Sequence, residues 1–244
     1  MTCLSVNINK VALLRNSRGR DFPSVLGFAE RCLALGAHGI TLHPRPDQRH
    51  ARYRDVEELL PLVCGQYGRE LNVEGYPAEE LLQLVERVRP TQFTLVPDAP
   101  GQLTSDHGWD LQRHEGLLRE VIARLKHQGI RVSLFVDHDQ PHLELAAAYG
   151  ADRVELYTEP YAMAFGTPQE AAVLAGFRAA AARAQAAGLG VNAGHDLNLL
   201  NLGRFLQIPG ILEVSIGHAL TVECIERGVE FVIGRYLQIV GGGA

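Results

Sequence analysis

The chain has few features that would place it in a membrane, a disulfide framework or a complex with nucleic acid. Its four cysteines are far apart and form no CxxC pair, so we expect neither a zinc site nor disulfides, but reduced thiols in a cytoplasmic protein. No stretch approaches the roughly 18 apolar residues of a membrane span, and Met1 to Lys10 lack the basic and apolar segments of a signal peptide. The net charge of −5 argues against an extended nucleic-acid surface.

One unit recurs along the 244 residues. An amphipathic helical stretch ends in Gly, which supplies the left-handed residue that ends a helix. A short, nearly apolar run follows, as is typical of parallel strands covered by helices. Eight strands are predicted in this way, at Leu4–Ile8, Gly39–His43, Leu71–Glu74, Phe93–Val96, Val132–Val136, Arg153–Tyr157, Gly190–Asn192 and Leu212–Ile216.

The alternation of strands and helices predicts an α/β protein with a parallel sheet. Eight such units favour a closed (β/α)₈ TIM barrel over an open doubly wound sheet, and the length suits one such domain. The sequence contains no evident linker, so residues 1–244 are predicted to form a single barrel domain. Within it, Thr167-Pro-Gln-Glu170 predicts the start of a helix with a capping box and Pro at the first helical position.

Most of the predicted strands end in a residue that can take part in chemistry. In a barrel these carboxyl ends share one rim, where the active sites of this fold are found. Each residue alone is weak evidence, because a lone His or Glu is as often structural. Their shared position is harder to explain by chance, and it involves Asn7, Asn9, His43, Glu74, Glu155, His195 and His218.

Three segments near this rim could hold an anion. The segment His43–His50 is either a solvated loop or a site for a phosphorylated substrate, since Arg grips phosphate with a planar fork and His exchanges protons near neutral pH. The stretch Arg15–Arg20 either adds cationic donors or is a plain basic turn. Gly-His pairs follow the seventh and eighth strands, at Gly194-His195 and Gly217-His218, where this fold often binds phosphate. Their glycines either admit an anion or only allow tight turns.

Two further features have alternative interpretations. Glu155 is a charged residue inside an apolar strand. It either points into the barrel and stabilises cationic intermediates, or forms a structural ion pair with an Arg. The segment Pro97–Asp110 is long and polar, and it either closes over a substrate as a lid or is a mobile loop.

Taken in order, segments over nearly the whole chain resemble the pyridoxine 5′-phosphate synthase family. The resemblance implies the condensation of 3-amino-2-oxopropyl phosphate with 1-deoxy-D-xylulose 5-phosphate, which gives pyridoxine 5′-phosphate, phosphate and water. It also implies a homo-octamer that needs no organic cofactor and no metal. Several such segments in order are far more specific than any single motif. They are residues 6–16, Gly39–Arg45, Arg49-His50, Asn72–Glu74, Leu95–Pro97, Val132–Phe135, Val191–His195 and Ile216–His218.

The resemblance implies roles for individual residues. His43 and Glu74 would be proton acceptors, His195 a proton donor and Glu155 the group that stabilises the transition state. Closing the ring needs several proton transfers, which His and Glu of raised pKa suit. Positions that hold the amino-ketone phosphate are Asn7, Arg18, Asp196, Gly217 and His218, and those around the pentulose phosphate are Asn9, Lys10, Arg45, His50 and Thr104.

The chain departs from the family at two substituted positions and in the segment Tyr53–Arg69, which is longer than in some relatives. Asn9-Lys10 stands where many members have Asp-His, and Asp196 stands where Gly is common, so we expect the Asp196 side chain to point away from phosphate. Three rival interpretations remain open. One is another sugar-phosphate barrel, such as an aldolase, for which Lys10 is the only candidate strand-end lysine. The others are a metal hydrolase, which lacks support from a His-x-His start, and a barrel that binds ligands without catalysis.

Overall fold

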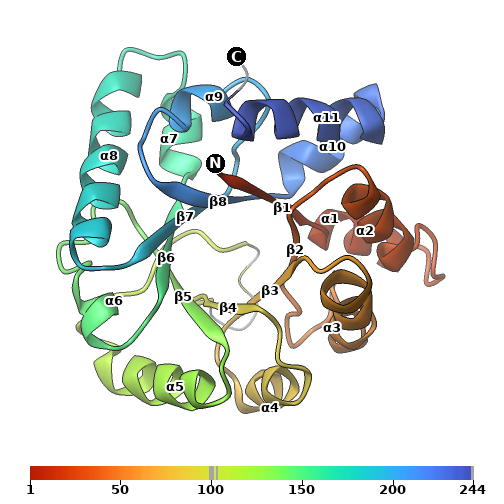
Figure 1. The fold of residues 1–244 in the computed structure, drawn as a ribbon, viewed down its shortest axis with the longest axis horizontal. Coiled ribbons are helices and arrows are strands. Elements are labelled where there is room, and N and C mark those ends of the chain that lie inside the picture. Colours follow the sequence, from red (N-terminus) through yellow and green to blue (C-terminus); the bar gives the residue numbers. More distant parts are fainter. Residues whose placement is uncertain (99–101, 103, 243–244) are drawn as a thin grey trace.

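The computed structural model describes residues 1–98, 102 and 104–242, and within them eight parallel strands close into a barrel in chain order (Figure 1). β1 pairs with β2 on one side and with β8 on the other, which closes the ring. The predicted (β/α)₈ fold is therefore confirmed. The strands are β1 (Cys3–Asn7), β2 (Gly39–Leu42), β3 (Glu70–Gly75), β4 (Gln92–Leu95), β5 (Arg131–Val136), β6 (Arg153–Tyr157), β7 (Gly190–Gly194) and β8 (Ile211–Ile216).

Helices surround the ring of strands (Figure 1). After α3 the chain continues into a π-helical segment, η1 (Pro61–Gln66), before it enters β3. In the described part of the chain the helices are α1 (Asn9–Asn16), α2 (Val25–Ala34), α3 (Tyr53–Leu60), α4 (Glu79–Val88), α5 (Glu115–His127), α6 (Leu145–Ala148), α7 (Glu159–Ala164), α8 (Glu170–Ala186), α9 (Leu202–Phe205), α10 (His218–Arg227) and α11 (Val229–Val240).

The predicted capping box at Thr167 is wrong in detail. Helix α8 begins at Glu170, with Gln169 as its N-cap residue. The Thr167 hydroxyl instead donates to the carbonyl of Ala164, at 2.7 Å, and accepts from the Gln169 amide. The Glu170 carboxylate accepts a hydrogen bond from the Gly166 amide at 2.9 Å. These local bonds hold the turn before the helix, and the helix therefore starts later than predicted.

The strands have one apolar side and one polar side. Their apolar residues, such as Leu4, Val6 and Ile40, pack in one cluster with buried residues of the surrounding helices. The alternate residues are polar and bond to one another, as in the 2.6 Å contact between the Ser5 and Thr41 hydroxyls. They therefore line the inside of the barrel, where branched apolar residues are usual. This buried polar set includes Ser5, Thr41, Asn72, Gln92, Thr94, Ser133, Glu155, Asn192, Glu213 and Ser215.

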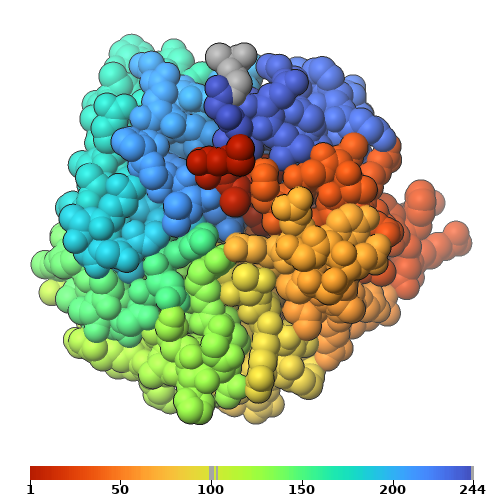
Figure 2. Space-filling model, in the orientation of Figure 1, coloured from red at the N-terminus to blue at the C-terminus, as the bar shows by residue number. Residues whose placement is uncertain are grey.

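Figure 2 shows the face of the molecule on which the chain begins. The first residues, in red, lie near the middle of this face, between the blue C-terminal segments and the orange segments around α2 and α3. Of the helices in the described part of the chain, none is both long and apolar enough to cross a membrane.

Candidate active site at the barrel mouth

Side chains with acid–base chemistry gather at the carboxyl ends of the strands. We call these ends and the loops that follow them the mouth. β1 ends at Asn7, β3 carries Glu74 next to its last residue, and His43 follows β2 directly. His195 follows β7 in the same way. The predicted shared position is thus what the fold produces from four separate segments.

The backbone at His43 is held by two asparagines of the first strand and the helix after it. The Asn9 side-chain oxygen accepts a 2.8 Å hydrogen bond from the His43 amide. The Asn7 side-chain oxygen in turn accepts from the Asn9 amide, at 3.1 Å. An amide oxygen accepts such a bond as a carboxylate would, so the contact does not depend on a charge at position 9.

Side chains of α1 hold the backbone of the loop after His43 through hydrogen bonds. The Asn16 side-chain nitrogen donates to the carbonyls of Gln48, Arg49 and His50, at 2.8–3.1 Å. Arg15 also donates to the His50 carbonyl, at 3.2 Å. Because these bonds fix the backbone, the loop presents its side chains in a defined arrangement.

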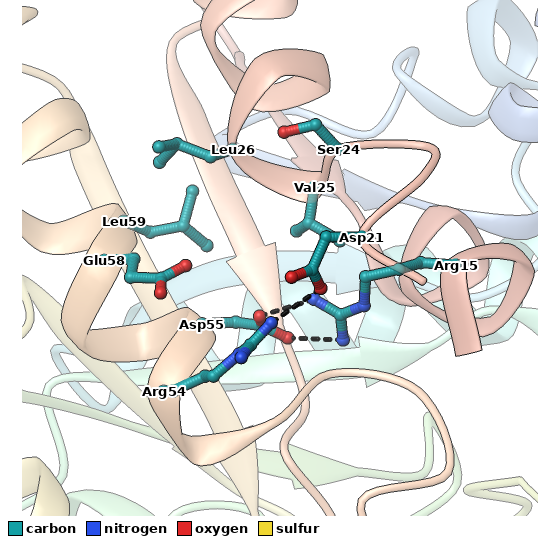
Figure 3. A pocket seen from close by; sticks show the side chains of 9 residues that line it. All are labelled: Arg15, Asp21, Ser24, Val25, Leu26, Arg54, Asp55, Glu58 and Leu59. Carbon is teal, nitrogen blue, oxygen red and sulfur yellow. Dashed lines mark hydrogen bonds and ion pairs between the residues drawn. The ribbon is translucent and has the colours of Figure 1, made fainter. Parts of the chain in front are cut away.

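Arg15 is a structural residue and does not lie free to meet a substrate, so of the cations in Arg15–Arg20 it is not available as a donor to an anion. Its guanidinium is buried and forms two parallel bonds, of 2.6 and 2.9 Å, with the Asp55 carboxylate (Figure 3). The pair lines a pocket of about 200 Å³ beside α2 and α3. Next to it, Arg54 pairs with Asp21 at 2.6 Å, and both side chains are exposed. The pocket thus surrounds a structural ion pair and lies outside the mouth.

The imidazoles of the mouth are held in the neutral form. Burial and then the charge of Arg45 lower the pKa of His43 well below its usual range. Burial, Arg45 and Arg49 lower the pKa of His50 to about 4. Burial, Lys10 and Arg45 lower the pKa of His195 to about 4. Each of these groups feels the Arg45 charge, so the structure brings all of them together around this guanidinium.

The pKa values of two buried carboxyls of the mouth are raised, which also favours their neutral, protonated form. Burial, followed by the nearby carboxylates of Asp98 and Glu213, raises the pKa of Glu74, whose oxygen accepts from the Asn7 side chain at 3.4 Å. Burial and the charge of Glu74 raise the pKa of Glu155 well above its usual range. Among the described residues, Glu155 Oε2 has no hydrogen-bond partner. The predicted alternative of an Arg ion pair for Glu155 is therefore wrong.

Gly194 makes room for this carboxyl. A Cβ atom on Gly194 would lie 2.3 Å from Glu155 Oε1, closer than any real contact. The next two residues have left-handed backbones, with φ of 81° at His195 and 58° at Asp196. Such conformations are strained for residues with side chains and concentrate at functional sites. The Thr158 hydroxyl donates to the Gly194 carbonyl at 2.6 Å and holds this turn.

The His195 ring lies against two aromatic rings that sequence reasoning did not select. Its centroid is 5.2 Å from that of Phe135 and 5.2 Å from that of Tyr157. Phe135 and Tyr157 form a small buried cluster with Val96, separate from the main core. These apolar neighbours explain why burial dominates the shift of the His195 pKa.

Arg45 lies inside the mouth and is bound to the loop after β4. It pairs with the buried Asp98 carboxylate and donates to the Gln102 carbonyl at 2.9 Å. Arg49 donates to the same carbonyl. Asp98 was not among the predicted site residues, although its place three residues beyond β4 was the available signal.

Part of the predicted lid is fixed to the barrel. The Gly108 amide donates to Asp137 at 3.0 Å, and the indole of the buried Trp109 donates to the Leu95 carbonyl at 2.9 Å. Residues 99–101 and 103 of the predicted lid lie outside the described residues.

Three of the predicted binding residues are exposed rather than enclosed by the mouth. Arg18 lies on the turn after α1, and Thr104 lies on the loop after β4. His218 is the first residue of α10, with Gly217 as N-cap, and it lines a surface pocket of about 300 Å³ between residues 198–200 and α10. Within residues 1–98, 102 and 104–242, no group of three or more His, Cys, Asp and Glu side chains is arranged to hold a metal ion.

The fold and the mouth together define an enzyme of the (β/α)₈ barrel class, with acid–base groups at the carboxyl ends of its strands. The chain belongs to the family described as pyridoxal phosphate biosynthesis protein PdxJ, whose model matches residues 4–242.

Curated relatives agree with this placement, and solved structures agree with the fold. The chain is 54% identical over 249 residues to pyridoxine 5′-phosphate synthase of Xanthomonas oryzae, with 99% of this chain and 97% of that protein covered. It is 50% identical over 240 residues to the protein of the same name from a Chelativorans species, with 96% and 97% covered. Thiamine phosphate pyrophosphorylase from Pyrococcus furiosus superposes with a TM-score of 0.63 at 14% identity, over 99% of this chain and 96% of that one. At that identity the likeness shows the fold alone.

Proposed function

We propose that this chain condenses 3-amino-2-oxopropyl phosphate with 1-deoxy-D-xylulose 5-phosphate to give pyridoxine 5′-phosphate, phosphate and water. The observation that carries the proposal is the meeting of His43, Glu74 and His195 at one mouth, in a chain about half identical to relatives that bear the name pyridoxine 5′-phosphate synthase. The two phosphorylated substrates bind at the mouth. The reaction closes the pyridine ring of vitamin B6.

His43 and Glu74 are the proton acceptors in this proposal. A neutral imidazole can accept a proton, and the lowered pKa keeps His43 neutral at physiological pH. The raised pKa of Glu74 lets its carboxyl exchange protons near neutral pH, where an ordinary Glu remains ionised. Their proximity to Arg45 supports action on the same bound substrate.

His195 is the proton donor and Glu155 the stabilising carboxyl. In the free protein the cations Lys10 and Arg45 help to lower the pKa of His195. Dianionic substrates bound beside these cations would offset them and make a protonated imidazole more accessible. Glu155 is kept neutral by burial, and a cationic intermediate would favour its ionised form.

The substrate phosphates need separate sites, and two sets of residues are assigned to them. The pentulose phosphate lies near the cations at the mouth, with Arg45 and Lys10 as charged donors. The amino-ketone phosphate lies at the amino end of α10, where unpaired N–H groups favour an anion. The first set is Asn9, Lys10, Arg45, His50 and Thr104, and the second is Asn7, Arg18, Asp196, Gly217 and His218.

The same proposal covers the working form of the protein. Residues 1–244 act as one domain, in the cytoplasm, without an organic cofactor or metal. We propose a homo-octamer on the basis of the family resemblance, and light scattering of the purified protein tests that state directly.

The test is an assay with the two substrates and no added cofactor or metal. We expect an ultraviolet-absorbing product with the mass of pyridoxine 5′-phosphate, together with released phosphate, only when both substrates are present. His195→Asn should abolish product in a folded protein. The proposal would be overturned if folded wild-type protein forms no product, even with freshly prepared substrates and at higher enzyme concentration.

A further inference from the structure

Asp98 lies between His43, the predicted proton acceptor, and Arg45, the predicted phosphate ligand. Its Oδ2 atom pairs with the Arg45 guanidinium, accepts a 2.9 Å hydrogen bond from the Ser105 hydroxyl and lies 3.8 Å from His43 Nε2. His43 and Arg45 belong to the loop after β2, and Ser105 belongs to the loop after β4 that carries Asp98 itself. One carboxylate oxygen of Asp98 thus lies next to both His43, the proposed proton acceptor, and Arg45, the proposed phosphate ligand.

We propose that Asp98 is a positioning residue of this active site, whose carboxylate holds Arg45 in place and supplies the negative charge that faces the His43 imidazole. The inference rests on the proposed function, because His43 and Arg45 take their roles from it. The Asp98 side chain is only 3% exposed, and those of Arg45 and His43 are 7% exposed. Water therefore screens the three groups weakly.

Hydrogen bonds around Asp98 leave capacity free for a ligand. Among the buried atoms of the described residues that lack a hydrogen-bond partner, three belong to this group: Asp98 Oδ1, Arg45 Nε and Arg49 Nε. Buried polar atoms are normally paired, so such a group of unmet donors and acceptors marks a place where a substrate completes the bonding. A sugar phosphate offers both the oxygens that the guanidiniums lack and the hydroxyl that a carboxylate lacks.

The Asp98 charge acts on the proposed bases in a defined direction. A proton taken by His43 creates an imidazolium next to this carboxylate, which stabilises it as the acidic member of a catalytic triad does. The same charge helps to raise the pKa of Glu74. Other charged and titratable groups face these residues. Around His43 they are Arg45, Arg49, His50 and His195. Around Glu74 they are Arg45, Glu155 and Glu213, and near Asp98 they are Asp106 and His107.

Asp98→Asn is the decisive variant, because it keeps the shape and removes the charge. We expect kcat to fall about 10²-fold, the lower end of the contribution of a proton-transfer group. Without the carboxylate, the pKa values of both Glu74 and His43 decrease, so the acidic limb of the kcat/KM profile should move to lower pH. KM for the pentulose phosphate should also rise a few-fold, because Arg45 loses the carboxylate that holds it in place.

Two matched variants separate this role from a purely structural one. Asp98→Glu retains the charge and should restore the acidic limb of the wild-type profile. Ser105→Ala retains the charge but removes one bond that orients it, and should lower kcat a few-fold without moving the limb, roughly as loss of one hydrogen bond predicts. Wild-type kcat and pH profile in Asp98→Asn would overturn the proposal. If Asp98→Asn does not fold by circular dichroism, an unchanged kcat in Ser105→Ala would overturn it.

One readout does not depend on turnover. The ¹⁵N chemical shift of His43 Nε2, assigned with a His43→Asn variant, should change between wild type and Asp98→Asn. If the wild-type protein makes no pyridoxine 5′-phosphate but this shift changes, the proposed reaction fails while the Asp98–His43 contact stands. An unchanged shift in a folded variant would contradict the contact itself.

Discussion

The two ends of the barrel interior carry buried charges of different kinds. At the amino ends of the strands, a lower layer contains two bases and two acids: Arg131, Arg153 and Glu70, which are partly buried, and Glu213, which is buried. Arg131 bonds to Glu70, and Arg153 lies 3.5 Å from Glu213. At the mouth, Glu74 accepts a hydrogen bond from the neutral Asn7 side chain at 3.4 Å, and no ion pair joins it to a cation within the described part of the chain.

This difference separates charges that hold the fold from charges available for chemistry. An ion pair between complementary partners is expensive to break, because breaking it leaves one charge unpaired. A buried acid or base without such a partner has a shifted pKa, as Glu155 and His195 do at the mouth. Substitutions in the lower layer should therefore change stability, and substitutions at the mouth should change turnover.

The two ends of β2 give the largest expected contrast. His43 follows the strand at the mouth, whereas His38 precedes it and accepts a hydrogen bond from the Leu4 amide at 3.1 Å. We expect His43→Asn to lower kcat/KM about 10²–10⁴-fold, as for loss of a general base. His38→Asn, in which an amide oxygen can still accept the bond, should retain activity within a few-fold. Steady-state kinetics of both variants measure this, and equal losses would contradict the division.

Breaking the Arg15–Asp55 pair should give the largest loss of stability. Asp55→Ala leaves a buried guanidinium without its carboxylate, so we expect a decrease of about 3–5 kcal/mol in the free energy of unfolding. Arg54→Ala removes the neighbouring exposed pair with Asp21 and should change it by less than about 1 kcal/mol. Urea unfolding of the two variants provides the comparison. Similar small changes in both would show that the buried pair contributes little.

The lower layer has its own pH signature. Burial raises the pKa of Glu213 to about 7, although Arg153 partly opposes this. The folded protein thus binds a proton that the unfolded chain releases near its ordinary pKa of about 4.5, and stability falls as pH rises between the two values. Glu213→Gln removes this dependence. We expect the variant to gain on the order of 1–3 kcal/mol relative to wild type from pH 4.5 to 7.5, and parallel stability curves would be the contrary result.

The tight contact between Gly194 and Glu155 can be tested with one methyl group. Gly194→Ala should displace the Glu155 carboxyl, lowering stability by about 1–3 kcal/mol and reducing kcat. Gly116→Ala in α5 meets no atom within 4 Å and should be neutral or stabilise by roughly 0.5–1 kcal/mol. Thermal melting and the two-substrate assay report both effects. Full activity in the Gly194→Ala protein would show that turnover does not depend on the position of the Glu155 carboxyl.

Asn9 should give the smallest effect. Asn9→Asp keeps an oxygen that can accept from the His43 amide, so we expect activity within about three-fold of wild type, less than one hydrogen bond is worth. Asn9→Ala removes the acceptor and should lower kcat/KM roughly five-fold, equivalent to about 1 kcal/mol. Kinetics that rank Asp below Ala would show that charge matters more here than the hydrogen bond.

Local patterns predicted the framework of the molecule but not the long-range pairing. Gly after helices and short apolar runs located all eight strands, with β7 running two residues beyond its predicted end. The burial of Arg15 was not predictable, because its partner Asp55 lies 40 positions away and both residues are ordinary surface types. Asp98 was missed for the same reason, since its partner Arg45 lies 53 positions away. The helix start at Thr167 failed because its hydroxyl bonds backward to Ala164.

Product formation by two Glu→Gln variants tests the division between the mouth and the lower layer most directly. Both Glu74 and Glu213 are buried, raised in pKa and placed inside the same barrel. We expect Glu74→Gln to lose about 10²–10⁴-fold in the two-substrate assay, and Glu213→Gln to stay within a few-fold of wild type. Equal activities, or a loss confined to Glu213→Gln, would contradict the assignment of chemistry to the mouth.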